Sequence, residues 1–184
     1  MTPLAAVSHQ AAAKVPASPR AAALAVALAV VLGALAIVGL RALVVEPVRV
    51  ASGSMSPTLG QGDIVVVNKR DRIPARGDLV TFTSPQDGER AMKRVVGIGG
   101  DVVAIRDAIL YVNDVEVQET YVDHESIDAL YSGPVTVAIG SVLVLGDLRA
   151  ESIDSRSYGD IPLEEVSGTV VARLWPTGAI PSLE

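Results

Sequence analysis

The apolar positions of this chain fall into two patterns that meet near residue 44. Residues 21 to 40 are 20 consecutive uncharged residues, almost all Ala, Leu, Val, Ile or Gly, and beyond them the apolar runs are short and separated by turn-forming residues. Twenty helical residues span about 30 Å, the thickness of a bilayer hydrocarbon core. The pattern predicts a transmembrane helix over residues 21–43 and a mostly β domain over residues 44–184.

Short runs rich in β-branched residues mark the expected strands of the second region. Asn113 and Asp114 stand between two such runs, and both tolerate positive φ, which favours a tight hairpin. Residues 124–133 are polar and unpatterned and are expected to form a surface loop. The strands are expected at residues 64–67, 79–83, 93–98, 102–105, 109–112, 135–139, 142–145 and 169–174.

The basic residues around the apolar stretch predict its orientation. Residues 1–20 are rich in Ala, Ser and Pro and are expected to be a disordered tail. Lys14 and Arg20 precede the stretch, whereas Glu46 offsets the arginines that follow it, so the positive-inside tendency places the tail in the cytoplasm and the β domain outside. The alternative is a cleaved signal peptide, whose apolar region is usually about 7–15 residues.

Charge and composition exclude several functions. The first 41 residues contain three basic and no acidic residues, and the other 143 contain 21 acidic and 12 basic residues, which gives +3 and −9 and the net charge of −6. An acidic β domain argues against a nucleic-acid partner. The chain has no cysteine, hence no disulfide or thiol nucleophile, and its carboxylates lack the spacing of a calcium loop.

A serine-rich turn follows the apolar stretch, in the sequence Ser52-Gly53-Ser54-Met55-Ser56-Pro57-Thr58-Leu59. Gly53 permits a close turn and Pro57 prevents a regular strand, so Ser54 can be presented on an exposed corner as a nucleophile. The alternative is an ordinary Ser/Gly turn at the end of a strand, since such turns are common. The turn alone does not decide between the two.

A serine nucleophile needs a base, and the β domain offers His124, Lys69 and Lys93. Strand alternation places Lys93 on the opposite face from Met92 and Arg94, where it can point into an apolar cleft. Burial there would lower the pKa of Lys93 and make the neutral amine a usable base. The alternative is a solvated strand lysine.

A third cluster of polar residues lies between Gly146 and Arg156. Its composition alone favours a structural loop over a catalytic one. The residues that can form ion pairs within it are Asp147, Arg149, Asp154 and Arg156.

The three clusters together resemble the type I signal peptidases, membrane-bound Ser-Lys proteases that remove signal peptides from exported proteins. The resemblance covers most of residues 45–176. It is carried by Glu46-Pro47, by Ser52-Gly53-Ser54-Met55 with Pro57-Thr58-Leu59, by Gly62-Asp63, by Arg76-Gly77-Asp78-Leu79-Val80, by Lys93-Arg94-Val95-Val96-Gly97 with Gly100-Asp101, and by Gly146-Asp147 with Ser152, Asp154, Ser155 and Arg156.

The resemblance implies a mostly antiparallel β fold and a role for each matching residue. Ser54 is the expected nucleophile, Lys93 the general base, Ser52 an oxyanion donor beside the Ser54 N–H, and Ser152 the hydroxyl that orients Lys93. Small pockets would select Ala-x-Ala before the cut, with the residue at −2 facing away. The expected ion-paired support is Asp147, Asp154 and Arg156, joined by Arg94, and the expected pocket residues are Val48, Val50, Leu59 and Met92.

The resemblance also implies the cellular setting and leaves two rival functions. It implies secretory preproteins as substrates, a lipid bilayer as partner, and no cofactor or metal. Leu148 stands where the family usually has Asn, Ala150 where Asp is frequent, and Ala51 where Pro is frequent. The rivals are a repressor-type self-cleaving Ser-Lys protease, disfavoured by the apolar stretch, and a membrane-anchored β module without catalytic activity, disfavoured by Ser54 and Lys93.

Overall fold

The computed structural model describes residues 19–122 and 132–181, so His124 and most of the expected loop at 124–133 lie outside the described residues. The chain divides into two units, Met1–Leu40 and Arg41–Glu184. We describe each by itself.

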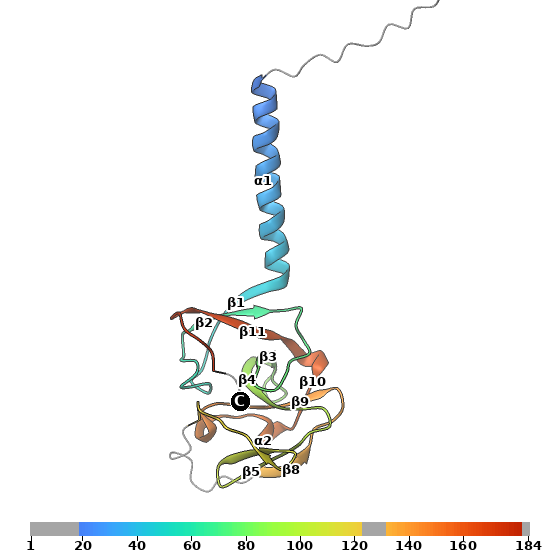
Figure 1. The fold of residues 1–184 in the computed structure, drawn as a ribbon, viewed down its shortest axis with the longest axis vertical. Coiled ribbons are helices and arrows are strands. Elements are labelled where there is room, and N and C mark those ends of the chain that lie inside the picture. Colours follow the sequence, from blue (N-terminus) through green and yellow to red (C-terminus); the bar gives the residue numbers. More distant parts are fainter. Residues whose placement is uncertain (1–18, 123–131, 182–184) are drawn as a thin grey trace, which may run out of the picture. The chain divides into compact units, whose positions relative to one another are not determined.

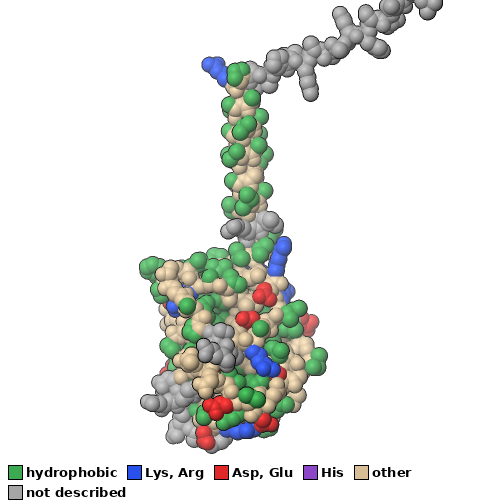
Figure 2. Space-filling view, viewed as in Figure 1, with side chains coloured by type: hydrophobic (Ala, Val, Ile, Leu, Met, Phe, Trp, Pro, Cys, Tyr) green, Lys and Arg blue, Asp and Glu red, His purple; other side chains and the backbone are tan. Residues whose placement is uncertain are grey.

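A single long helix makes up the described part of the first unit and runs into the second. Helix α1 spans Pro19–Val44, and proline is well tolerated in the first helical turn because its missing N–H has no partner there. Residues Ala22–Gly39 have a mean hydropathy of 2.7, with none of them buried. Figure 2 shows apolar side chains over the length of this helix. The apolar helix is confirmed, and it is long and apolar enough to cross a membrane.

Two antiparallel sheets form the second unit (Figure 1). The larger sheet has seven strands in the order β1-β2-β11-β3-β4-β9-β10. The short helical elements are η2 (Arg149–Glu151), α2 (Ser155–Tyr158) and η3 (Leu163–Glu165). The strands of this sheet are β1 (Val45–Arg49), β2 (Ile64–Asn68), β3 (Leu79–Thr83), β4 (Arg90–Ile98), β9 (Ser141–Leu145), β10 (Ile161–Pro162) and β11 (Val166–Trp175).

The smaller sheet has four strands in the order β7-β6-β5-β8. The predicted hairpin is present, because Asn113 and Asp114 have φ values of 55° and 62° and join β6 to β7. The strands are β5 (Val102–Arg106), β6 (Ile109–Val112), β7 (Val115–Glu116) and β8 (Ser132–Thr136). The fold is therefore mostly antiparallel β, as the sequence predicts.

The core lies on both faces of β4, whose residues 93–97 are all buried. Val95 and Val96 are both fully buried, and they belong to different apolar clusters. A third cluster lies below the serine-rich turn and consists of Val50, Met55, Leu59, Val65, Val67 and Leu79. We call it the turn cluster.

Two segments differ from the expected pattern. Strand β8 was expected at residues 135–139 and lies at Ser132–Thr136, because the Val137 N–H leaves the ladder to bind the Asp101 carbonyl and its side chain enters the core. Helix α2 was expected to be loop. Asp154 caps it by accepting a hydrogen bond from the Arg156 N–H, a signal that four residues are too few to reveal as periodicity.

Candidate active site

Ser54 and Lys93 meet although 39 positions separate them in sequence. Ser54 lies in the turn that follows β1, and Lys93 lies in the middle of β4. Lys93 Nζ is 2.6 Å from Ser54 Oγ. Lys93 is only 6% exposed, so water has little access to the amine. The structure thus brings the expected nucleophile and the expected base into hydrogen-bond contact.

The surroundings of Lys93 favour its neutral form. Burial is the main cause that lowers the pKa of Lys93, and the nearby positive charge of Arg156 lowers it further. The carboxylates of Asp154 and Asp147 oppose this, without outweighing it. A lysine amine with a lowered pKa can accept the proton of a hydroxyl.

Ser52 lies beside the Ser54 hydroxyl, and backbone hydrogen bonds hold the turn that carries both residues. Ser52 Oγ is 3.2 Å from Ser54 Oγ. The Ser56 N–H donates to the Gly53 carbonyl, and the Leu148 N–H donates to the Ser54 carbonyl. The turn is therefore fixed on one side by its own backbone and on the other by the polar loop between residues 146 and 156.

Gly146 lies so close to the turn that no other residue fits. A Cβ atom at Gly146 would lie 2.2 Å from Ser152 Oγ and 2.8 Å from the Ser54 carbonyl oxygen. The Ser152 hydroxyl is buried beside this contact and makes no hydrogen bond of acceptable geometry to any described residue, although its proximity lowers the pKa of Asp154. The expected bond between Ser152 and Lys93 is therefore not formed in this structure.

The expected ion-paired support is present as two separate pairs. Arg94 Nη2 is 2.7 Å from Asp147 Oδ2, and both side chains are almost fully buried. Arg156 Nε is 2.8 Å from Asp154 Oδ1. Burial opposes the ionisation of Asp154, but hydrogen bonds from Arg156 and from the Gly146 N–H hold the pKa of Asp154 below its usual range. Both carboxylates lie close enough to Lys93 to influence its charge.

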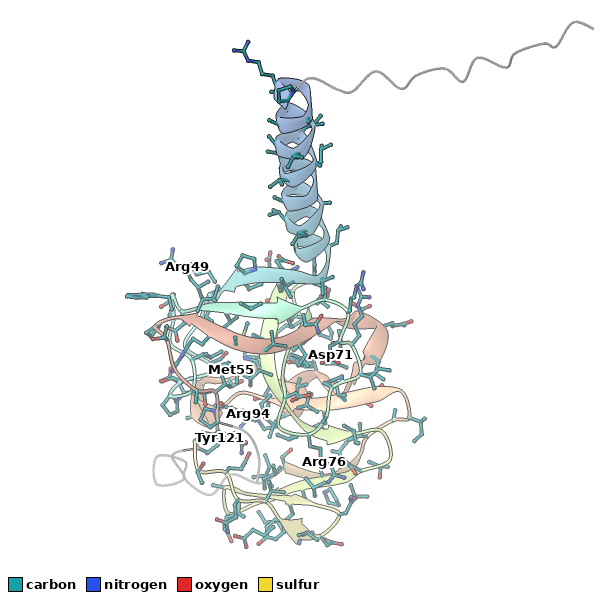
Figure 3. All side chains as sticks on the ribbon, turned by 45° about the horizontal axis from the view of Figure 1, so that its top comes forward. Arg49, Met55, Asp71, Arg76, Arg94 and Tyr121 are labelled. Carbon is teal, nitrogen blue, oxygen red and sulfur yellow. The ribbon has the colours of Figure 1, made fainter. Side chains whose placement is uncertain are left out.

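Part of this support carries no signal in the sequence. Arg149 forms a buried ion pair with Glu119, outside the loop in which its partner was expected. The Tyr121 hydroxyl also donates to Glu119, and the Arg94 guanidinium lies 3.9 Å from the centre of the Tyr121 ring (Figure 3). No motif marks Glu119 or Tyr121, because their role depends on the fold of a connection that follows β7.

A cleft of about 760 Å³ opens beside the dyad. Three of the expected pocket residues, Val48, Val50 and Met92, line it. Leu59 does not, because it is fully buried in the turn cluster beneath the cleft, so it supports the floor and does not touch a ligand. Lining residues that the sequence did not single out for this purpose include Met55, Ala91, Ile153 and Tyr158.

Two strands present unpaired edges to this cleft. Residues Arg90 to Lys93 pair with β3 on one edge, whereas the pairing with β9 on the other edge begins only at Arg94. The N–H and carbonyl of Val95 face the β3 side, so alternation turns those of Met92 toward the unpaired edge. Within the described chain, β1 pairs with β2 alone.

Comparisons with known proteins agree with this geometry. The family model described as signal peptidase, peptidase S26, matches residues 23–175. A probable signal peptidase I-2 of Synechocystis sp. is 36% identical over 149 residues, which cover 76% of this chain and 67% of that protein. A signal peptidase I of Bacillus caldolyticus is 36% identical over 152 residues, which cover 74% and 83%.

Two further matches extend the comparison. The thylakoidal processing peptidase 1 of Arabidopsis thaliana is 34% identical over 154 residues, but the match spans only 45% of that longer protein. The crystal structure of a signal peptidase I from Enterococcus faecalis is 32% identical, with a TM-score of 0.49 over 53% of this chain and 97% of that chain.

The chain belongs to the signal peptidase family, peptidase S26, and within it to the type I signal peptidases. It is a serine peptidase that removes signal peptides from secretory preproteins.

Proposed function

We propose that this protein is a single-pass membrane endopeptidase that works by a Ser54–Lys93 dyad and cuts after a small residue. The observation that carries the proposal is the 2.6 Å contact between Lys93 Nζ and Ser54 Oγ at a buried amine whose pKa is lowered. A hydroxyl becomes a good nucleophile only when an adjacent base takes its proton. Lys93 is the basic side chain that the described structure places against Ser54.

The reaction is acyl transfer in two halves. Neutral Lys93 takes the Ser54 proton as Ser54 Oγ bonds to the scissile carbonyl carbon, and the resulting ammonium gives the proton to the leaving amine as the C–N bond breaks. Lys93 then takes a proton from water as the water oxygen attacks the ester carbonyl carbon, and it returns that proton to Ser54 Oγ as the ester bond breaks. The Ser54 N–H and the Ser52 hydroxyl face the developing oxyanion, where such donors contribute ~3–4 kcal/mol.

The strand directions indicate how a substrate lies in the cleft. Four antiparallel pairings connect β1 to β4, so the two strands run in the same direction. A peptide strand between their edges can hydrogen-bond to both. Ser54 follows the end of β1 and Lys93 lies at the end of the unpaired part of β4, so the residues before the cut run parallel to both strands.

This pose explains selection at alternate positions. Side chains of an extended peptide point to opposite faces in turn, so the residues at −1 and −3 share one face. In this pose they face Val48, Val50, Met55 and Met92, which line the cleft, and we expect these apolar side chains to form shallow pockets that exclude a large residue. Ala-x-Ala is the expected motif.

The proposed cellular arrangement follows the two units of the chain. Helix α1 anchors the protein in the bilayer, residues 1–20 lie in the cytoplasm, and the β domain over residues 44–184 lies outside and contacts the lipid surface. The acidic β domain has no nucleic-acid partner in this proposal. Protease added to intact cells without an outer barrier should digest the β domain and spare the tail. Digestion of the tail alone would show that the chain has the opposite orientation.

Trapping the acyl-enzyme tests the dyad most directly. A preprotein labelled on its signal peptide and quenched in acid should leave a label on the wild-type chain, and proteolytic mapping should place it on Ser54. Ser54→Ala should give neither label nor cleavage, while Ser56→Ala, in the same turn, should retain both. A label on any other residue would contradict the assignment of Ser54.

Substituted preproteins test the specificity. Ala→Leu at −1 or −3 should reduce cleavage far more than Ala→Leu at −2, because exclusion by a small pocket is steric, whereas added hydrophobic contact changes affinity by only ~1–3 kcal/mol. Equal tolerance of Leu at all three positions would refute both the pocket and the strand pose.

A further inference from the structure

Residues 176–181, which we call the C-terminal segment, lie beyond the residues that the family model matches. After β11 the chain turns back, and Arg173 and Gly178 form an isolated antiparallel bridge (Figure 1). The Arg173 guanidinium lies against Gly178, where a Cβ atom would be 2.3 Å from Arg173 Nη2. The segment is therefore folded against the β domain.

The segment makes two contacts in the interior of the β domain. Ile180 packs against the turn cluster, which lies directly below the serine-rich turn. The Pro181 carbonyl accepts a hydrogen bond of 2.7 Å from Arg94 Nη1. Neither residue lines the cleft. The segment thus reaches the residue next to Lys93 without lying where a substrate would bind.

The Pro181 carbonyl completes the hydrogen bonding of Arg94. A guanidinium has five N–H donors, and Arg94 is fully buried. Two of its bonds go to Asp147, one to the Gly77 carbonyl and one to the Thr58 hydroxyl. Pro181 is the acceptor for the fifth N–H. Without it, a buried charged group would have an unsatisfied donor, which is costly and favours rearrangement of the whole group.

Movement of Arg94 would reach the nucleophile through Asp147. In the sequence, Asp147 lies between Gly146, where a Cβ atom would be 2.8 Å from the Ser54 carbonyl oxygen, and Leu148, whose N–H donates to that oxygen. The charges that face Lys93 are Asp154, Arg156 and Asp147. Those that face Arg94 are Asp147, Glu119 and the ring of Tyr121. A less neutralised Asp147 would stabilise the ammonium form of Lys93.

We propose that the C-terminal segment is a positioning element of the active site, in which Pro181 fixes Arg94 and, through Asp147, the geometry of Ser54 and Lys93. This inference rests on the proposed dyad. It assigns a catalytic consequence to residues outside the matched family region, and it acts on the chemical step because the segment does not touch the cleft.

Three variants of the full membrane-embedded chain separate this role from simple packing. The test variant ends at Ala179 and lacks both Ile180 and the Pro181 oxygen. The control ends at Pro181, where a terminal carboxylate still offers an oxygen to Arg94. The third variant, Ile180→Ser, keeps the Pro181 carbonyl in the chain and weakens only the packing that holds it. Each is assayed for kcat, KM and the pH dependence of kcat/KM with one preprotein.

The chain ending at Ala179 should have about tenfold lower kcat, with KM changed by less than about twofold. The acidic side of its pH profile of kcat/KM, which we call the acid limb, should move to higher pH. The control should match the full chain, and Ile180→Ser should lie between them. Unchanged kcat and acid limb in the Ala179 chain would refute the inference. If that chain does not fold, the Ile180→Ser variant provides the test. A lower thermal midpoint together with a wild-type kcat and a wild-type acid limb would show that the segment contributes to packing alone, and it would refute the inference. Activity of Lys93→Ala would instead refute the dyad itself.

Discussion

Lys93 and Arg94 are neighbours in β4, yet their side chains leave the strand on opposite faces and meet different surroundings. Arg94 is enclosed by a carboxylate, carbonyls, a hydroxyl and an aromatic ring, and its pKa is raised because these partners outweigh the effect of burial. Lys93 is buried against a serine hydroxyl, no carboxylate of the described residues is hydrogen-bonded to it, and its pKa is lowered. One strand thus supplies a permanent cation on one face and a proton acceptor on the other.

The contrast shows that burial alone does not decide the charge of a basic residue. Both side chains lose water, and the difference is the set of partners that replaces it. In the proposed mechanism Arg94 acts through its charge, because it pairs with Asp147, whose carboxylate favours the ammonium form of Lys93. We expect substitutions on the two faces of β4 to affect activity and stability differently.

The largest effect is expected at Lys93. Lys93→Ala should lower kcat/KM for preprotein cleavage by about a thousandfold or more, since the base is lost. Lys93→Arg should be equally inactive, because a guanidinium does not deprotonate. Lys69→Ala is the matched control and should retain activity. Substantial cleavage by Lys93→Ala would move the role of base to another residue, such as Lys69 or His124.

Arg94→Met should lower the free energy of unfolding by ~3–5 kcal/mol, because it leaves the buried Asp147 without its partner. Urea denaturation followed by circular dichroism measures the change. In the same variant the acidic side of the pH profile of kcat/KM should lie at higher pH than in the wild type, because unpaired Asp147 raises the pKa of Lys93. Arg106→Met removes an exposed ion pair with Asp114 and should change stability by less than ~1 kcal/mol. Equal losses in the two variants would contradict the contrast between a buried and an exposed pair.

Ser152→Ala should lower kcat by about tenfold and leave KM nearly unchanged. Its hydroxyl is buried near Asp154 and makes no hydrogen bond to Lys93 in the described structure, so we expect a small rotation of Lys93 during the reaction to bring the two groups into contact. Ser157→Ala, on the exposed side of α2, is the control. A wild-type kcat for Ser152→Ala would remove Ser152 from the mechanism.

The smallest effect is a gain in stability. The folded pKa of Lys93 lies below the ordinary value of 10.5, so at neutral pH the unfolded chain binds the proton more tightly, which disfavours folding. Lys93→Met should raise the thermal midpoint by a few degrees at pH 7. The gain should shrink as the pH rises toward 10.5, where the unfolded lysine also loses its proton. A gain that grows with pH would contradict a lowered pKa.

Much of the fold, and the meeting of Ser54 with Lys93, could be predicted because the signals are local. Uninterrupted apolar residues mark α1, β-branched runs mark most strands, and Ser54 and Lys93 stand in short recognisable motifs. Glu119, Tyr121 and Pro181 could not be found this way. Each contributes through one contact with an arginine that is distant in sequence, and such a pairing leaves no period or spacing to detect.

Leu59 shows a different limit of prediction from sequence, because it stands in a recognisable motif but its orientation could not be predicted. It was expected to line the substrate pocket, but it lies in the core, because the motif does not tell whether a side chain faces the cleft or the core. The turn after Ser54 rotates Leu59 beneath Met55, with the Leu59 N–H bound to the Met55 carbonyl. A position fixed by the direction of a single turn requires coordinates.

The point at which β9 joins β4 limits the length of the unpaired edge that faces the cleft. Four residues, Arg90 to Lys93, are left without a second neighbour, and at about 3.3 Å per residue they measure roughly 13 Å. If a preprotein binds along this edge as proposed, we expect only about this length of its chain to form backbone hydrogen bonds with β4, because beyond Lys93 the edge is already paired with β9. Recognition would then depend on a few residues before the cut and not on the rest of the exported sequence.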